Sequence, residues 1–285
     1  MLRQLLLTAL LALLPQIAGE PPYERMREAI RQGRLDDAVS FGELAIKREP
    51  ARSEVHYWLG RAYAQKAQEA SLLKKFSWAK KCRIAFEKAV QLDPSNSDAG
   101  IDLIQYYLLA PGFAGGGIEE ARALAPHVGS TDSSRQLLAQ ALLLQGDGKA
   151  VEAEAAFRKA LEKDPEDERN LTHFMTFLVA EKRFADGLEL CRQHIKSHPD
   201  VKGTLYQLGK LASVRGQQLE EGLQSLDEFL KTPTKPIGPT WADARYRKGL
   251  ILLKLGRRDE ARAEFQIAVK LNPSHPGATK ELKKF

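Results

Sequence analysis

The strongest candidate for reactive chemistry in this sequence is a short run of sulfur and imidazole side chains. Cys191, His194 and His198 are spaced three and four residues apart, and His173 precedes them. On a helix this spacing places the three side chains on one face, where thiolate and imidazole suit Zn²⁺ or a softer metal. The favoured alternative is structural, because Cys packs as a small apolar residue and a buried His often serves only as a hydrogen-bonding group. We therefore expect no metal site. Cys191, His194 and His198 are the candidate ligands for the less favoured alternative, in which a metal binds.

Motifs for catalysis or nucleotide binding are missing from the 285 residues: there is no HExxH, GxSxG, Walker or Rossmann pattern. The segment 111–117 is glycine-rich, but Glu119 and Glu120 follow it in the first turn of a predicted helix, where they would repel a phosphate. We predict a protein that is not an enzyme, with no catalytic residues, no cofactor and no small-molecule substrate.

Composition favours a folded chain that is not adapted to nucleic acid. Hydrophobic residues make up 43% of the chain and charged residues 28%, which is enough apolar material for a core. The formal net charge is +6, but acidic residues are interspersed throughout, so no nucleic-acid partner is expected. The two cysteines, Cys82 and Cys191, lie too far apart in the sequence to indicate a disulfide framework.

The first 19 residues have the pattern of a signal peptide. Arg3 supplies a positive charge, Leu5–Leu14 is apolar apart from one Thr, and small residues follow at Ala18 and Gly19. Ten residues span about 15 Å as a helix, roughly half of a bilayer's hydrocarbon core, so this run is too short for a membrane span. We expect export to a bacterial periplasm with residues 1–19 removed. Secretion and an N-terminal membrane anchor are the alternatives.

One residue pattern recurs along the rest of the chain. Its clearest copy is ADARYRKGLILLKLGRRDEARAEFQIAVKLNP, whose characteristic residues are Tyr246, Gly249, Gly256, Ala261, Phe265, Ala268 and Pro273. The segments AEAAFRKALEKDP and CRIAFEKAVQLDP repeat its second half, and Pro165, Pro199 and Pro233 are each 34 residues apart. The prolines end helices, and the glycines let helices approach closely. The pattern therefore predicts helical hairpins that bury their apolar faces by stacking.

This pattern resembles the tetratricopeptide-repeat (TPR) family. The resemblance implies an all-α, right-handed α-solenoid that binds other proteins, and it covers nearly all of residues 20–285. We expect about seven hairpins and a C-terminal capping helix near 275–285. The hairpins are expected at 22–50, 53–94, 97–128, 132–165, 167–199, 201–232 and 240–273.

Two segments depart from the regular repeat. The second hairpin, 53–94, has about ten extra residues without Gly or Pro, which predicts longer helices rather than a loop. The third contains a glycine-rich loop at 110–117. This combination is similar to a group of bacterial exported TPR proteins and, more distantly, to the TPR-like regulators of microtubule dynamics. The similarity covers roughly residues 53–125 and implies a role in protein association.

The extension of the second hairpin is basic. Lys74, Lys75 and Lys81 surround Trp78, an arrangement that suits an anionic membrane or an acidic partner. The competing interpretation is a solvated lysine face with Trp78 folded against the next repeat. Peripheral membrane contact through the basic helix 74–83 is therefore an alternative function, as in an envelope-assembly or membrane-surface factor.

The first helices of TPR hairpins form a concave surface on which partners bind. Six residues are expected there: Tyr57, Arg61, Arg135, Tyr206, Lys210 and Tyr246. Tyr and Arg bury a large area and keep a polar end, but ordinary packing between repeats explains the tyrosines equally well. The leading prediction is a non-catalytic scaffold or adaptor that binds a protein or peptide in this groove. A metal-binding role near Cys191 is less favoured.

Overall fold

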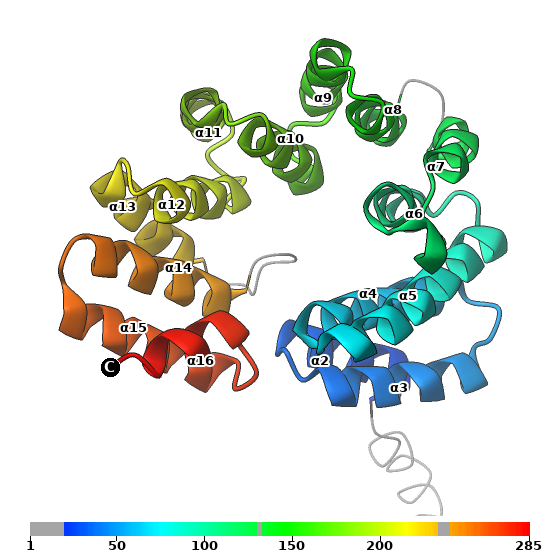
Figure 1. The fold of residues 1–285 in the computed structure, drawn as a ribbon, viewed down its shortest axis with the longest axis horizontal. Coiled ribbons are helices and arrows are strands. Elements are labelled where there is room, and N and C mark those ends of the chain that lie inside the picture. The colour runs from blue at the N-terminus through cyan, green and yellow to red at the C-terminus, as the bar shows by residue number, and fades with distance from the viewer. Residues whose placement is uncertain (1–19, 130–132, 233–239) are drawn as a thin grey trace, which may run out of the picture.

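The computed structural model describes residues 20–129, 133–232 and 240–285, and all regular structure in them is helical (Figure 1). The helices form seven hairpins and a final short helix. The hairpins are α2 (Pro22–Arg31) with α3 (Leu35–Arg48), α4 (Ser53–Glu69) with α5 (Leu72–Leu92), α6 (Ser97–Leu109) with α7 (Ile118–Leu124), α8 (Ser134–Gly146) with α9 (Ala150–Lys163), α10 (Glu168–Ala180) with α11 (Phe184–Ser197), α12 (Gly203–Arg215) with α13 (Leu219–Leu230), and α14 (Trp241–Lys254) with α15 (Arg258–Leu271).

The last helix, α16 (Pro276–Leu282), covers the end of the array, and two short 3-10 helices, η1 (Gly112–Ala114) and η2 (Ala125–His127), lie in the third hairpin. The prediction of an all-α solenoid of about seven hairpins with a capping helix is confirmed. The expected signal peptide, residues 1–19, lies outside the described residues. Among the helices that are described, none is both long and apolar enough to cross a membrane.

Two glycines of the repeat pattern, Gly60 and Gly249, lie where the two helices of a hairpin cross. A Cβ added to Gly60 would lie 2.6 Å from the ring of Phe86, and one on Gly249 would lie 2.7 Å from Cδ1 of Phe265. Both phenylalanines are buried. In these two hairpins the first helix therefore needs a residue without a side chain where the second helix inserts its aromatic ring.

Apolar packing runs along the array instead of gathering at one centre. Three clusters of buried residues follow one another, extending from Tyr23 to Leu103, from Ile101 to Leu211 and from Tyr206 to Ala278. Each cluster joins side chains of adjacent hairpins. This arrangement is the one expected when a single hairpin cannot bury its own apolar face.

The array curves until its two ends meet, so the helices form a nearly closed ring (Figure 1). The turn at Gly33, between α2 and α3, lies against Asn272 at the end of α15, and a Cβ on Gly33 would overlap the Asn272 side chain. Residues of both ends, among them Gln32 and Trp241, line one small cavity at this junction. The first helix of each hairpin lies on the inner side of the ring.

The second and third hairpins have distinctive shapes. Helices α4 and α5 have 17 and 21 residues, whereas no other described helix exceeds 14. The loop after α6 is held against that helix by hydrogen bonds: the Tyr106 hydroxyl donates to the Ala114 carbonyl at 2.7 Å, and the Gly117 amide donates to the Tyr107 carbonyl at 2.9 Å. The loop is thus fixed on α6, and its 3-10 helix η1 contacts the elongated helix α5.

Candidate protein-binding groove

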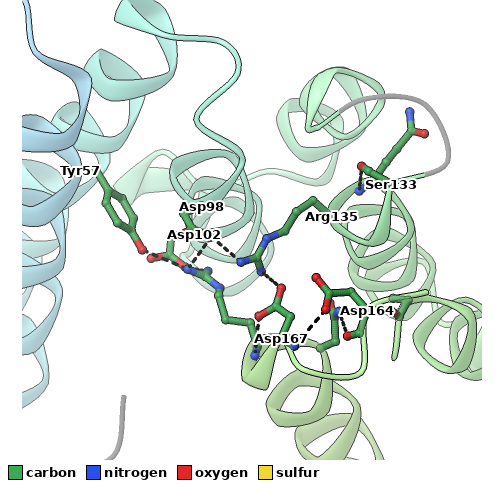
Figure 2. Close-up of polar contacts among 11 residues, drawn as sticks. Tyr57, Asp98, Asp102, Ser133, Arg135, Asp164 and Asp167 are labelled. Atoms are coloured by element: carbon green, nitrogen blue, oxygen red, sulfur yellow. Dashed lines mark hydrogen bonds and ion pairs between the residues drawn. The ribbon is translucent and has the colours of Figure 1, made fainter. Parts of the chain in front are cut away.

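Charged side chains on the inner face link four successive hairpins (Figure 2). The Arg169 guanidinium donates to the Tyr57 hydroxyl at 3.0 Å and pairs with Asp102. Arg135 lies 2.9 Å from Asp98, and its other Nη atom lies 2.8 Å from a carboxylate of the fifth hairpin. We call this set the ionic ladder, and its members are Tyr57, Asp98, Asp102, Arg135, Asp167 and Arg169.

Burial and the charges of the ladder shift the pKa values of groups in the ladder and beside it. Burial raises the pKa of Tyr57 to about 12, with Asp102 adding to the effect. Burial acts to lower the pKa of Arg169, but Asp102, Tyr57 and Asp98 outweigh it and raise that pKa. Burial, reinforced by Arg169 and Arg135, lowers the pKa of His173 to about 3. The tyrosine and histidine are therefore neutral at neutral pH, and the arginine is charged and paired.

Most of the six residues expected on the concave face are used for packing. Tyr57 and Arg135 belong to the ionic ladder. Tyr206 is buried against Phe229, with ring centroids 5.6 Å apart, and Tyr246 packs against Phe265 and His275. These four side chains lie on first helices, as expected, but their contacts are within the molecule.

Two of the six residues line cavities. Lys210 borders a cavity of about 110 Å³ between α10 and α12, and burial lowers its pKa. Arg61 borders a much larger cavity of about 640 Å³ between α4, α5 and α6. Arg61 is therefore the predicted concave residue that lines the larger of these two cavities.

We call the larger cavity the α4–α6 groove. Its lining residues are Arg61, Ala64, Gln65, Ala67 and Gln68 from α4; Lys75, Phe76, Ala79, Cys82 and Phe86 from α5; and Asp102, Gln105, Tyr106, Leu109, Ala110, Pro111 and Ala114 from α6 and the loop after it. Asp102 also belongs to the ionic ladder. The groove is thus walled by the long hairpin on one side and by the third hairpin with its glycine-rich loop on the other.

Large apolar side chains are exposed at the edge of this groove. Leu109 is 81% exposed, Phe113 79% and Phe76 38%. The rings of Phe76 and Phe113 meet edge to face, with centroids 5.0 Å apart. Phe76 is exposed because α5 extends beyond the apolar surface that its neighbours supply.

In the basic extension, the lysine side chains are exposed, whereas Trp78 packs against its own hairpin. Lys74, Lys75 and Lys81 are exposed, and Lys75 lines the α4–α6 groove. Trp78 stacks on Tyr63 of its own hairpin with centroids 5.7 Å apart, and the Lys81 ammonium lies 4.9 Å from the centroid of the Trp78 ring. Trp78 is therefore folded against α4 of its own hairpin.

The residues considered for a metal are engaged in structural contacts. The two ring nitrogens of His194 lie 2.8 Å from the Pro165 carbonyl and 2.9 Å from the Thr204 hydroxyl. Cys191 is buried beside Met175, and burial raises the pKa of its thiol to about 12. His198 contacts the hydroxyl of Ser197. Throughout the described ranges, no group of three His, Cys, Asp or Glu residues could hold a metal ion.

Sequence reasoning missed the partners that complete the ionic ladder: Asp98, Asp102, Asp167 and Arg169. One signal was present, because Arg135 and Arg169 are 34 residues apart and therefore occupy equivalent positions in successive hairpins. No comparable signal in the sequence indicated that Leu109 and Phe113 are exposed. Their exposure depends on how far the loop after α6 lies from the next helix.

Two segments match the tetratricopeptide-repeat family in sequence, at residues 23–74 and 242–275. A comparison with curated proteins gives no match. The fold is similar to that of a tetratricopeptide-repeat protein from Parabacteroides merdae, with a TM-score of 0.51 and 15% identity over 92% of this chain and 96% of that one. It is also similar to yeast Tom70, with a TM-score of 0.56 and 14% identity over 89% of this chain and 51% of that one. The repeat pattern and the two family matches show that residues 23–74 and 242–275 are tetratricopeptide repeats, and the fold of the whole chain is similar to that of tetratricopeptide-repeat proteins.

Proposed function

We propose that this protein is a non-catalytic scaffold that binds a protein or peptide partner in the α4–α6 groove. The observation that carries the proposal is the pair Leu109 and Phe113, two large apolar side chains exposed beside a cavity of about 640 Å³. Exposed apolar side chains that gather at one cavity are typical of interaction sites. TPR proteins generally mediate association between proteins, and this groove is where that property fits the chain best.

The rest of the inner face supports this choice of site. On the ionic ladder, Arg135 and Arg169 already have carboxylate partners. A ligand that bound there would have to break these pairs, and each broken pair would leave a partly buried charge without a partner. The groove requires no such rearrangement, because its apolar edge is exposed.

The test removes the apolar edge without disturbing the core. The double variant Leu109→Ser/Phe113→Ser should lose the proteins that cross-link to the wild-type chain in its native cells. Val151→Ser is a matched control, because Val151 is 80% exposed on α9, away from the groove. Retention of the same cross-linked proteins by the double variant would place the binding site elsewhere, and recovery of no reproducible partner would contradict the scaffold role.

We further propose that the protein acts after export, on the pattern of residues 1–19. N-terminal sequencing of the protein from fractionated cells tests this. A mature chain that begins near residue 20 in the periplasmic fraction would support export, and an intact N-terminus in the cytoplasmic fraction would contradict it.

The alternative of a membrane-surface factor rests on the exposed lysines of α5. Trp78, which would be the natural side chain to enter a bilayer, is partly buried by its contacts with Tyr63 and Lys81. Flotation with anionic vesicles measures this directly, and Lys74→Glu/Lys75→Glu should abolish flotation if the basic helix is the contact. Absence of flotation by the wild-type protein would remove this alternative.

A further inference from the structure

Two cations face the α4–α6 groove without an acidic partner. Arg61 is half-buried, and its guanidinium lies 5.0 Å from the centroid of the Trp58 ring. Lys75 is exposed on α5, the second helix of the same long hairpin, and also lines the groove. Neither forms an ion pair with any residue that the structure describes, in contrast to the arginines of the ionic ladder. The long hairpin brings these two charges, which are 14 positions apart in sequence, to the same cavity.

The groove has no free negative charge to balance them. Asp102 is the acidic residue among those that line it, and Asp102 is already paired with Arg169. Lys74, Lys80 and Lys81 are exposed on the same helix as Lys75. The local field is therefore positive, while the walls are formed by apolar residues such as Ala79, Cys82 and Leu109.

The nature of the occupant follows from the cost of covering these charges. An apolar segment that filled the groove would bury part of Arg61 against carbon atoms, and an unpaired buried cation is strongly unfavourable. A segment with a carboxylate beside its apolar side chains removes this cost and adds charge-assisted hydrogen bonds. Charge complementarity therefore selects among the apolar partners that the groove can accommodate.

We infer that the occupant is an acidic–apolar peptide segment of a partner protein. Its large apolar side chains lie between Ala79, Phe86 and Leu109, and an Asp or Glu side chain lies beside Arg61 and Lys75. This inference rests on the proposed function, because it specifies what the groove binds. Arg61 and Lys75 act as specificity-determining residues, and the exposed Leu109 and Phe113 supply the apolar contact.

The first experiment selects peptides from a displayed random library on the full chain, with removal of those that also bind Ala79→Trp, in which the groove is filled. Leu109→Glu serves as a second counter-selection variant, because Leu109 is exposed and its replacement does not touch the core. The relevant peptides bind the wild type but neither variant. The inference is supported if these peptides are enriched in Asp or Glu next to Leu, Ile or Phe. Apolar peptides without acidic enrichment would overturn the inference and leave the proposed function standing. If no peptide depends on the groove, the proposed function fails as well.

The second experiment compares one selected peptide with its Asp→Asn/Glu→Gln counterpart by fluorescence anisotropy, both with amidated C-termini. The acidic peptide should bind about tenfold more tightly, and Arg61→Gln/Lys75→Gln should abolish that difference. The control Arg262→Gln/Lys159→Gln removes the same amount of charge at exposed positions outside the groove. This control should preserve the difference in affinity between the two peptides. Equal affinity of the two peptides for the wild type would overturn the inference. The inference would also be overturned if Arg61→Gln/Lys75→Gln abolished flotation with phosphatidylglycerol vesicles but left peptide binding unchanged.

Discussion

Arg169 on α10 donates a hydrogen bond to the Tyr57 hydroxyl on α4 at 3.0 Å, although the two residues are 112 positions apart and belong to the fifth and second hairpins (Figure 2). Asp102 lies between them in the same network. The contact spans two intervening hairpins, so it requires the inner face to be strongly curved. We therefore expect the ionic ladder to stabilise both the fold and its curvature.

Removal of Arg169 tests this expectation. Arg169→Ala leaves Asp102 partly buried without its cation, which should lower the free energy of unfolding by about 2–3 kcal/mol. The radius of gyration from small-angle scattering should also increase as the inner face opens. Arg158→Ala is the control, because Arg158 is exposed and its loss should cost less than about 0.5 kcal/mol. Equal destabilisation by the two variants would contradict a special role for the ladder.

Acidification should destabilise the fold through His173, which lies near the two arginines of the ladder. The folded state lowers the pKa of this imidazole from 6.5 to about 3, because burial and the two arginines disfavour its charged form. The unfolded chain therefore binds a proton below pH 6.5 that the folded chain does not, and stability falls as pH decreases from 6.5 towards 3. The loss at pH 5 should be up to about 2 kcal/mol.

Urea unfolding of His173→Gln at pH 7 and pH 5 measures this loss of stability. The variant should lose much of the pH dependence, though not all of it, because burial also lowers the pKa of His194. His127→Gln, at an exposed position on η2, is the control and should behave like the wild type. An unchanged pH dependence in His173→Gln would show that the imidazole does not couple to folding.

The crossing of α14 and α15 should not tolerate a methyl group. A Cβ at Gly249 would lie 2.7 Å from Cδ1 of Phe265, so Gly249→Ala should cost about 1–3 kcal/mol by overpacking. Gly112→Ala is a matched substitution with no atom within 4 Å of the new Cβ, and it should be close to neutral. Thermal denaturation compares the two variants, and equal stability would mean that the helices separate at little cost.

The two thiols should differ in their access to reagents. Burial raises the pKa of both Cys82 and Cys191 to about 12, so both should react slowly with iodoacetamide at pH 8. Cys82 lines the α4–α6 groove and should be alkylated before Cys191, whose surroundings are closed. Peptide-level mass spectrometry over time measures both rates. Faster labelling of Cys191 would contradict the described packing of α11.

The groove combines residues that the sequence placed in separate functional groups. Arg61 was expected on the concave face, whereas Lys75 was expected on a basic surface for membranes or acidic partners. The structure brings both to one cavity because α4 and α5 extend side by side beyond the normal repeat length. Helical spacing predicts the face of a helix, but it does not predict which neighbouring element that face meets.

The sequence determined the number, order and length of the helical hairpins, because Gly60, Gly249 and the helix-ending prolines act locally or within a single hairpin. It also identified the long second hairpin and the glycine-rich loop as the irregular segments. Only the tertiary structure decided that Arg169 meets Tyr57, that the ends of the array touch at Gly33 and Asn272, and that Arg61, Lys75 and Leu109 surround one groove. These contacts depend on small rotations between successive hairpins that accumulate along the array, and no local residue pattern encodes their sum.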